Sequence, residues 1–268
     1  GTAVLARLIA KEDFGVVAMA MALVSLASIV NGLGLASATV QAPEIDGPRL
    51  SNLFWIGIGS SLGFIAVIAA VAPTYAAFMG EPRVAWILVA ASSGLLLNAA
   101  AQQHYALLER RLRFRATVTI HLTSLLLGLG VGLGLAFAEA GAWALVAQGL
   151  TTNLVVMIGS WALVGWLPSF PSHAPGTRRL VAFGLRVTTA ELTNGVSSNA
   201  TSMMVGRFEG ATPLAVFSKS NAIVYLATRQ LSAPLSGVVL PVLSRLQHDE
   251  DGFRRFYLRA VALPPLVG

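Results

Sequence analysis

Three ionisable residues, Arg186, Glu191 and Arg229, lie deep inside long apolar stretches of this 268-residue chain and could do chemistry there. If those stretches cross a bilayer, a charge inside them is costly, so each residue is a candidate for function. At a helical rise of about 1.5 Å per residue, Glu191 and Arg229 lie about 15 Å and about 16 Å from the same end of two successive antiparallel helices. The two side chains could simply neutralise each other. Alternatively, Glu191 titrates, or Arg229 faces a cavity and attracts an anionic group.

Two groups of uncharged polar residues also interrupt apolar stretches. The first group is Asn194, Ser198 and Thr201, whose i, i+4, i+7 spacing places them on one face of a helix. The second group is the run Asn98, Gln102 and Gln103. Such residues can line a cavity that accepts sugars, or they can hydrogen-bond across helices and hold the helices together.

The elements that must position these residues are seven apolar stretches. They are 14–40, 53–78, 84–108, 116–138, 143–165, 181–206 and 214–240. Each has 23 to 27 residues, and about 20 suffice to cross a hydrocarbon core of about 30 Å. Charged residues are 11% of the chain and the mean hydropathy is +0.72, whereas soluble domains contain roughly a quarter charged residues. The sequence therefore predicts an all-α polytopic membrane protein.

The basic residues predict how the helices are oriented. Eleven of the eighteen Lys and Arg residues fall in every second gap, namely 41–52, 109–115, 166–180 and 241–259. Because basic residues are retained on the cytoplasmic side, we expect these four gaps to be cytoplasmic. The net charge of +6 is thus explained by topology and by contact with anionic lipid head groups, and not by a nucleic acid.

A Pro-rich segment and a repeat divide the chain into two lobes. Residues 166–180 contain three prolines and no periodicity, which is typical of a linker. Residues 7–16 align without a gap on residues 207–216, at an offset of 200. Six predicted crossings separate the two copies, so the repeats are parallel and related by an axis along the membrane normal. We therefore predict a first lobe at 1–165, a cytoplasmic linker at 166–180 and the start of a second lobe at 181–268, with further helices at both ends.

Five segments carry a resemblance to a known family. They are Leu5–Gly15, Phe78–Pro82, Ala106–Arg115, Ala140–Gln148 and Pro241–Gln247. In this order they resemble the polysaccharide and O-antigen flippases of the multidrug/oligosaccharidyl-lipid/polysaccharide exporter superfamily. The resemblance implies two parallel helical bundles in a V-shaped fold, with this chain covering about the end of helix 1 to the start of helix 9. It also implies a transporter in the bacterial inner membrane that flips a polyprenyl-diphosphate-linked oligosaccharide by alternating access.

The resemblance implies an anionic substrate, which the basic residues could bind. Arg229 would attract the lipid diphosphate, and Arg186, about 7–8 Å inside the cytoplasmic end, would bind it bidentately or extend to the interface. A basic cluster in one cytoplasmic gap would set topology and could collect the substrate. This cytoplasmic basic cluster is Arg110, Arg111, Arg113 and Arg115. Membrane lipids and a coupling ion, H⁺ or Na⁺, complete the expected partners.

Two other functions stay open. A cation-coupled multidrug exporter of the same fold predicts a cavity dominated by acidic residues, whereas arginine outnumbers glutamate two to one among the three candidates within apolar stretches. A membrane-embedded glycosyl- or acyltransferase predicts a paired Asp/Glu or Asp/His site, and the sequence contains no such catalytic motif. The chain has no cysteine, so it contains no disulfide, zinc thiolate or redox motif. We expect no enzyme activity, no cofactor and no metal. One departure limits the resemblance. Related sequences often carry Arg-Asn-Leu-Asp where this chain has Ser198-Asn199-Ala200-Thr201, so no role of that acidic residue transfers.

Overall fold

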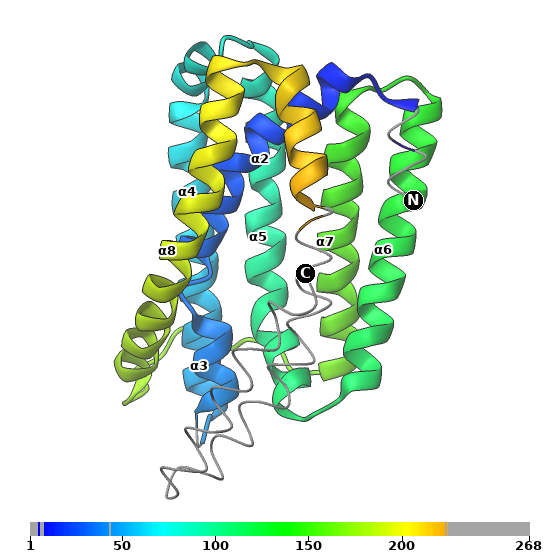
Figure 1. Ribbon diagram of the computed structural model, residues 1–268. Helices are drawn as coiled ribbons and strands as arrows, with labels where there is room; N and C mark the ends of the chain where they lie inside the picture. The colour runs from blue at the N-terminus through cyan, green and yellow to red at the C-terminus, as the bar shows by residue number, and fades with distance from the viewer. Residues whose placement is uncertain (1–4, 6–7, 43, 223, 225–268) are drawn as a thin grey trace, which may run out of the picture. The chain divides into compact units, whose positions relative to one another are not determined.

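The computed structural model describes residues 5, 8–42, 44–222 and 224, without the side chains of residues 190, 191 and 193–199. Most residues of this part of the chain are helical, and it contains no strand. Their bounds are α2 Lys11–Asn31, α3 Leu35–Gln41, α4 Gly47–Met79, α5 Arg83–Arg110, α6 Phe114–Phe137, α7 Ala142–Val164 and α8 Thr177–Phe208. The long helices run side by side as an up-and-down bundle (Figure 1). We call the end that carries Arg110 to Arg115 the basic end, and the other the opposite end.

Five of the predicted apolar stretches form helices long and apolar enough to cross a membrane. They are Lys11–Gln41, Gly47–Met79, Arg83–Arg110, Phe114–Phe137 and Ala142–Val164. The all-α polytopic fold is therefore confirmed. The predicted stretch 181–206 lies in α8, which has 32 residues but is too polar to belong to these five, so its crossing stays a prediction. Most of the stretch 214–240 lies outside the described residues.

The first apolar stretch is interrupted, which its hydropathy did not predict. Leu33 and Gly34 adopt left-handed backbone conformations with φ values of 46° and 56°, and they separate α2 from α3. A broken helix inside a membrane must find other partners for its freed carbonyl groups. Gln102 of α5 supplies one, because its Nε2 donates a hydrogen bond of 3.1 Å to the carbonyl of Gly32.

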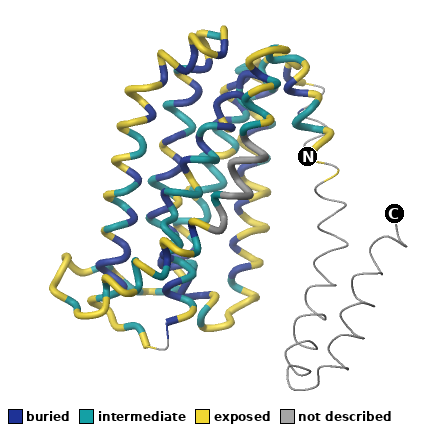
Figure 2. Tube along the Cα trace, turned by 60° about the vertical axis from the view of Figure 1, so that its left-hand side comes forward, coloured by how far each residue is buried: buried dark blue, intermediate teal, exposed yellow. Residues whose placement is uncertain are grey.

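Small residues and buried polar pairs hold the bundle together. Gly128 and Gly132 of α6 lie against Gln148 of α7, so the two backbones approach closely. Between α2 and α4, the Asn31 amide donates a hydrogen bond of 2.9 Å to the Ser61 hydroxyl, and both residues are buried. The outward faces of the helices are exposed (Figure 2). On α6 they are apolar, as a surface in contact with lipid requires.

The segment between α7 and α8 contains no helix, but the first turns of α4 bind its backbone. Asn52 donates a hydrogen bond of 2.7 Å to the Ser172 carbonyl and accepts one of 3.0 Å from the Ser172 amide. The Ser51 hydroxyl accepts a hydrogen bond of 3.0 Å from the amide of Ser169, whose carbonyl accepts one of 2.8 Å from the Trp55 indole. These bonds tie the predicted linker to the first lobe.

Helix α8 packs against α2 and α3 within the same compact unit, which extends to Val216. The closest approach is at Gly184, whose backbone lies against the backbone of Leu33 and Gly34 at the α2–α3 break. A side chain at position 184 would overlap the Leu33 carbonyl oxygen. The division into lobes at residues 166–180 stays a prediction, but the contact surface of α8 on the first lobe is defined.

Candidate functional site

A polar groove lies among α3, α5, α6 and α7. Its first part has a volume of about 370 Å³. The polar residues that line this part are Asn98, Gln102, Tyr105, Glu109, His121 and Asn153. A second part of about 420 Å³ lies between α2, α5 and α7 and shares Asn153 with the first. Its further polar residues are Gln148 and Thr152. We refer to these eight residues together as the polar groove.

The groove runs along the helices rather than across one level. Glu109 lies in the last turn of α5, at the basic end. Asn153 is eleven residues into α7, which is about 16 Å from the opposite end at a rise of about 1.5 Å per residue. Gln148 is about 9 Å from that end by the same rise. Polar groups therefore extend from the basic end past the middle of the bundle.

Several groove side chains lack hydrogen-bond partners among the residues that the structure describes. Thr152 is satisfied within its own helix, because its hydroxyl donates to the Gln148 carbonyl at 2.9 Å. The amides of Asn98 and Asn153, however, make no hydrogen bond to any residue that the structure describes. An amide without a partner in an apolar medium costs several kcal/mol. The groove is therefore suited to water or to a polar ligand.

The polar run 98–103 divides between two roles. Asn98 and Gln102 line the groove, whereas Gln103 is buried and its Oε1 accepts a hydrogen bond of 2.6 Å from Thr39. The cavity interpretation thus fits the first two residues and the packing interpretation fits Gln103. Tyr105 and Glu109 were not singled out from the sequence. Their spacing from Asn98, at i+7 and i+11, places all of them on one helical face and was available as a signal.

His104 belongs to packing rather than to the groove. Its ring is fully buried, stacks on Trp161 at 4.4 Å between centroids, and lies edge-on to Phe54 at 6.2 Å. Its Nε2 lies 3.0 Å from the carbonyl oxygen of Trp166, at the start of the segment that leads to α8. The histidine therefore fixes that segment to the bundle.

The cytoplasmic basic cluster splits in a similar way. Arg110 donates from Nη1 to the carbonyl oxygens of Thr39 and Ala42, at the end of α3. Arg113 donates from Nη1 to the Leu163 carbonyl at 2.9 Å, at the end of α7. Both arginines therefore cap the negative ends of neighbouring helices. Arg111 and Arg115 are exposed, and a role in contact with lipid or substrate stays a prediction for them.

Comparison with known proteins assigns the family. The sequence matches the family described as polysaccharide biosynthesis protein over residues 4–267. The chain belongs to this family. It is 25% identical over 248 residues to the succinoglycan biosynthesis transport protein ExoT of Rhizobium meliloti, covering 92% of this chain and 50% of that protein. It is 22% identical to the lipopolysaccharide biosynthesis protein WzxC of Escherichia coli, over 98% of this chain and 54% of WzxC.

A third relative extends the range to another polymer. The teichuronic acid biosynthesis protein TuaB of Bacillus subtilis is 22% identical, over 90% of this chain and 50% of TuaB. The chain thus spans about half the length of the curated relatives it matches. No solved structure matches it. As a member of this polysaccharide biosynthesis family with five membrane-crossing helices, the chain is part of a multi-pass membrane protein.

The remaining candidate residues of this family member lie on α8 and beyond it. Arg186 and Thr201 are exposed on α8. The side chains of Glu191, Asn194 and Ser198 lie outside the described part of the structure, as does Arg229 altogether. The ion pair, the cavity face and the diphosphate contact therefore stay predictions. Across the described ranges, no group of three His, Asp or Glu side chains could hold a metal ion.

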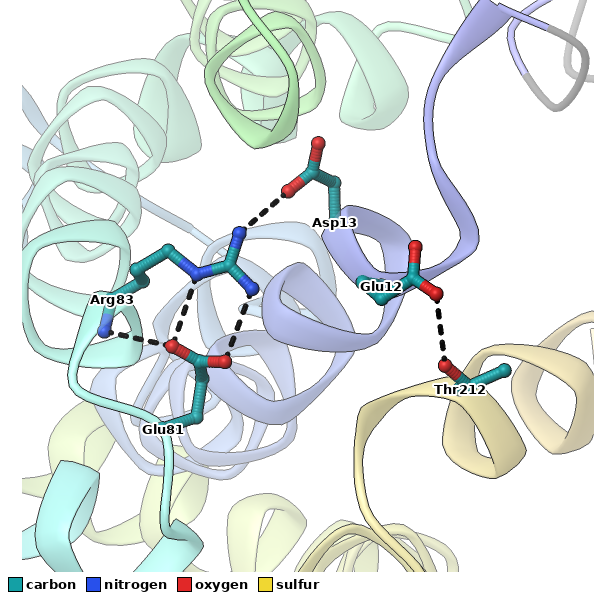
Figure 3. Close-up of polar contacts among 5 residues, drawn as sticks. All are labelled: Glu12, Asp13, Glu81, Arg83 and Thr212. Carbon is teal, nitrogen blue, oxygen red and sulfur yellow. Dashed lines mark hydrogen bonds and ion pairs between the residues drawn. The ribbon is translucent and has the colours of Figure 1, made fainter.

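Polar contacts join neighbouring segments at the opposite end of the bundle (Figure 3). Arg83 donates from Nη1 to Asp13 at 3.1 Å and from Nε to Glu81 at 3.0 Å. The hydrogen bonds from Arg83 hold the pKa of Glu81 below its ordinary value of 4.5. Thr212 donates to Glu12 at 3.5 Å. These two residues are 200 positions apart, which is the offset of the predicted repeat. The repeat itself stays a prediction.

Proposed function

We propose that the full protein containing this chain flips a polyprenyl-diphosphate-linked oligosaccharide across the bacterial inner membrane by alternating access. The polar groove is the observation that carries this proposal. The amide, hydroxyl and imidazole groups that line this open groove suit the hydroxyl groups of a sugar chain, which can both donate and accept hydrogen bonds. The similarity to ExoT, a succinoglycan biosynthesis transport protein, and to WzxC, a lipopolysaccharide biosynthesis protein, supports a saccharide cargo.

The two ends of the bundle support alternating access. At the opposite end, Glu12 and Asp13 of α2 contact Thr212 and Arg83, so polar contacts link α2 to α5 and to the segment after α8. At the basic end the first part of the groove reaches Glu109, in the last turn of α5. The groove is therefore accessible from the basic end in this conformation. We place the basic end in the cytoplasm, where the lipid-linked saccharide would be loaded.

A coupling ion is part of the proposal. Glu109 and His121 are the carboxylate and the imidazole that line the groove. A carboxylate beside amide groups on a transport path can bind a cation. H⁺ and Na⁺ are both candidates, and the assay distinguishes them.

The test is a flipping assay with the full-length protein in liposomes that contain a polyprenyl-diphosphate-linked oligosaccharide. The double substitution N98L/N153L replaces two groove amides by apolar side chains of similar size. At about 1 kcal/mol for each of the two lost hydrogen bonds to the cargo, the flipping rate should fall about thirtyfold.

Thr119→Val is the matched control, because Thr119 is exposed on α6, away from the groove, and its hydroxyl bonds only within its own helix. Its rate should equal that of wild type. Transport by N98L/N153L at the wild-type rate, with both variants equally folded, would contradict the proposal. A pH gradient and a Na⁺ gradient, applied separately, identify the coupling ion.

A further inference from the structure

A second pocket, of about 360 Å³, opens at the basic end, away from the polar groove. The end of α3, the start of α4 and the start of α8 enclose it. Arg49 and Arg179 line it, together with one acidic residue, Glu44. We call it the basic pocket.

Arg49 is held in position but keeps donors free. Its Nε donates to the Pro175 carbonyl at 2.8 Å and lies 3.7 Å from the Asp46 carboxylate, which also accepts a hydrogen bond from the Arg49 amide. No bond to a described residue occupies its two terminal nitrogens. Arg179 is exposed and its side chain makes no described hydrogen bond. Two guanidinium groups can therefore bind an anion in the pocket.

Two further features make the pocket electropositive. Helix α8 begins at the pocket with Gly176 as its N-cap, without a side-chain cap and without an acidic residue in its first turn. The positive end of that helix is thus uncompensated, and Arg178 and Arg179 add to it. On the other wall, the carbonyl of Ala42 is bound by Arg110, which brings a third guanidinium next to the pocket.

The rest of the pocket wall is apolar. Leu180 and Phe183 of α8 and Ala38 of α3 supply it. A soluble anion needs no such wall, whereas a lipid with a phosphate head group and a hydrocarbon chain matches both parts. We propose that the basic pocket binds the phosphate of an anionic membrane lipid, with the chain of that lipid along Leu180 and Phe183.

The bound lipid connects α8 to α3 and α4. Arg49 is on α4 and Arg179 is on α8, so one phosphate held by both arginines joins the start of α8 to the rest of the bundle. Two lipids present this chemistry, an anionic phospholipid and the polyprenyl diphosphate that carries the proposed cargo. Only the identity of the second lipid rests on the proposed function.

The experiment uses native mass spectrometry on the purified full-length protein, titrated separately with phosphatidylglycerol, phosphatidylcholine and undecaprenyl diphosphate. An arginine near a membrane surface contributes about five-fold to the binding of anionic lipid, so R49Q/R179Q should weaken it about 25-fold. The matched double variant R111Q/R115Q removes the same charge from the same end of the bundle but outside the basic pocket, so it should weaken binding much less than R49Q/R179Q does.

Two single variants guard against a folding defect caused by the loss of the Arg49 bond to Pro175. R179Q leaves that bond in place and should weaken binding about five-fold. E44Q removes the opposing charge and should strengthen binding by a similar factor.

The lipids whose binding is weakened in R49Q/R179Q identify the ligand of the basic pocket. A loss for phosphatidylglycerol alone identifies bulk lipid, a loss for undecaprenyl diphosphate alone identifies the cargo, and a loss for both identifies a general lipid-phosphate site. Equal binding by R49Q/R179Q and R111Q/R115Q, or unchanged binding by both R179Q and E44Q, overturns the inference. The groove variant N98L/N153L should bind these lipids normally, so failure of the transport proposal and failure of this inference give different results.

Discussion

Replacing Gly128 by alanine tests the packing that positions the groove wall on α7. A methyl group at this position would overlap the hydroxyl of Thr152 and lie 2.9 Å from the backbone oxygen of Gln148. Thr152 can rotate, at the cost of its 2.9 Å bond to the Gln148 carbonyl, but the backbone oxygen of α7 cannot move alone. The helices must therefore separate, and the polar residues Gln148 and Thr152 must move with α7.

The size of the effect follows from a comparison with Gly130, where an added methyl group meets nothing within 4 Å. Both substitutions gain the same helix propensity, about 1 kcal/mol. Only Gly128→Ala adds an overpacked contact, which costs about 1–3 kcal/mol. The free energies of unfolding of the two variants should therefore differ by about 1–3 kcal/mol, with Gly128→Ala the less stable.

The assay is equilibrium unfolding of the full-length protein in mixed micelles with increasing dodecyl sulfate, followed by far-ultraviolet circular dichroism. Gly130→Ala should equal or exceed wild type in stability. The reasoning is refuted if the two alanine variants have the same stability within about 0.5 kcal/mol, which is the ordinary scatter of surface substitutions. A fall in flipping rate for Gly128→Ala alone would link the same contact to the groove.

Three further outcomes follow from the polar contacts. Because the folded-state pKa of Glu81 is below 4.5, its bond to Arg83 should stabilise the fold fully above about pH 4.5 and progressively less as the pH falls through the lowered pKa. Glu81→Gln should remove this pH dependence of stability, which amounts to less than about 1 kcal/mol for so exposed a pair. A steeper loss of stability at low pH in the variant than in wild type would contradict the prediction. Arg110→Gln should lower the free energy of unfolding by about 1–3 kcal/mol, because it leaves the end of α3 uncapped. The control Arg111→Gln should change it by less than about 0.5 kcal/mol. Equal thermal stability of the two variants would exclude the capping role of Arg110. Asn52→Ala should speed amide hydrogen exchange in the segment before α8, since it removes both bonds to Ser172, and unchanged exchange there would show that the segment is held by other contacts.

The sequence alone predicts the membrane-crossing helices well because hydropathy depends on the solvent and not on neighbours. A run of 23 to 27 apolar residues must be helical in a bilayer, whichever helix it packs against. The turns between the helices are also predicted by the local sequence. Gly80 ends α4 with a φ of 71°, and Gly141 precedes α7 with a φ of 55°, as their positions in short Gly- and Pro-containing gaps predict.

The break between α2 and α3 cannot be predicted from the local sequence. Gly32-Leu33-Gly34 permits a left-handed conformation, but similar glycine spacing in 127–134 continues as a straight helix in α6. The difference is tertiary. At the break, Gln102 binds the Gly32 carbonyl and Gly184 approaches Leu33, whereas in α6 the glycines Gly128 and Gly132 are needed for contact with α7.

Composition and charge pattern thus determined that the chain is a multi-pass helical membrane protein with one basic end, because each of those properties is summed along the chain. Tertiary structure decided which polar residues meet. Gln102 faces the groove while its neighbour Gln103 is buried against Thr39, and Arg110 caps a helix while Arg111 is exposed. Adjacent residues in a helix point about 100° apart, so their roles depend on which neighbouring helix occupies each direction, and that is set only when the bundle is packed.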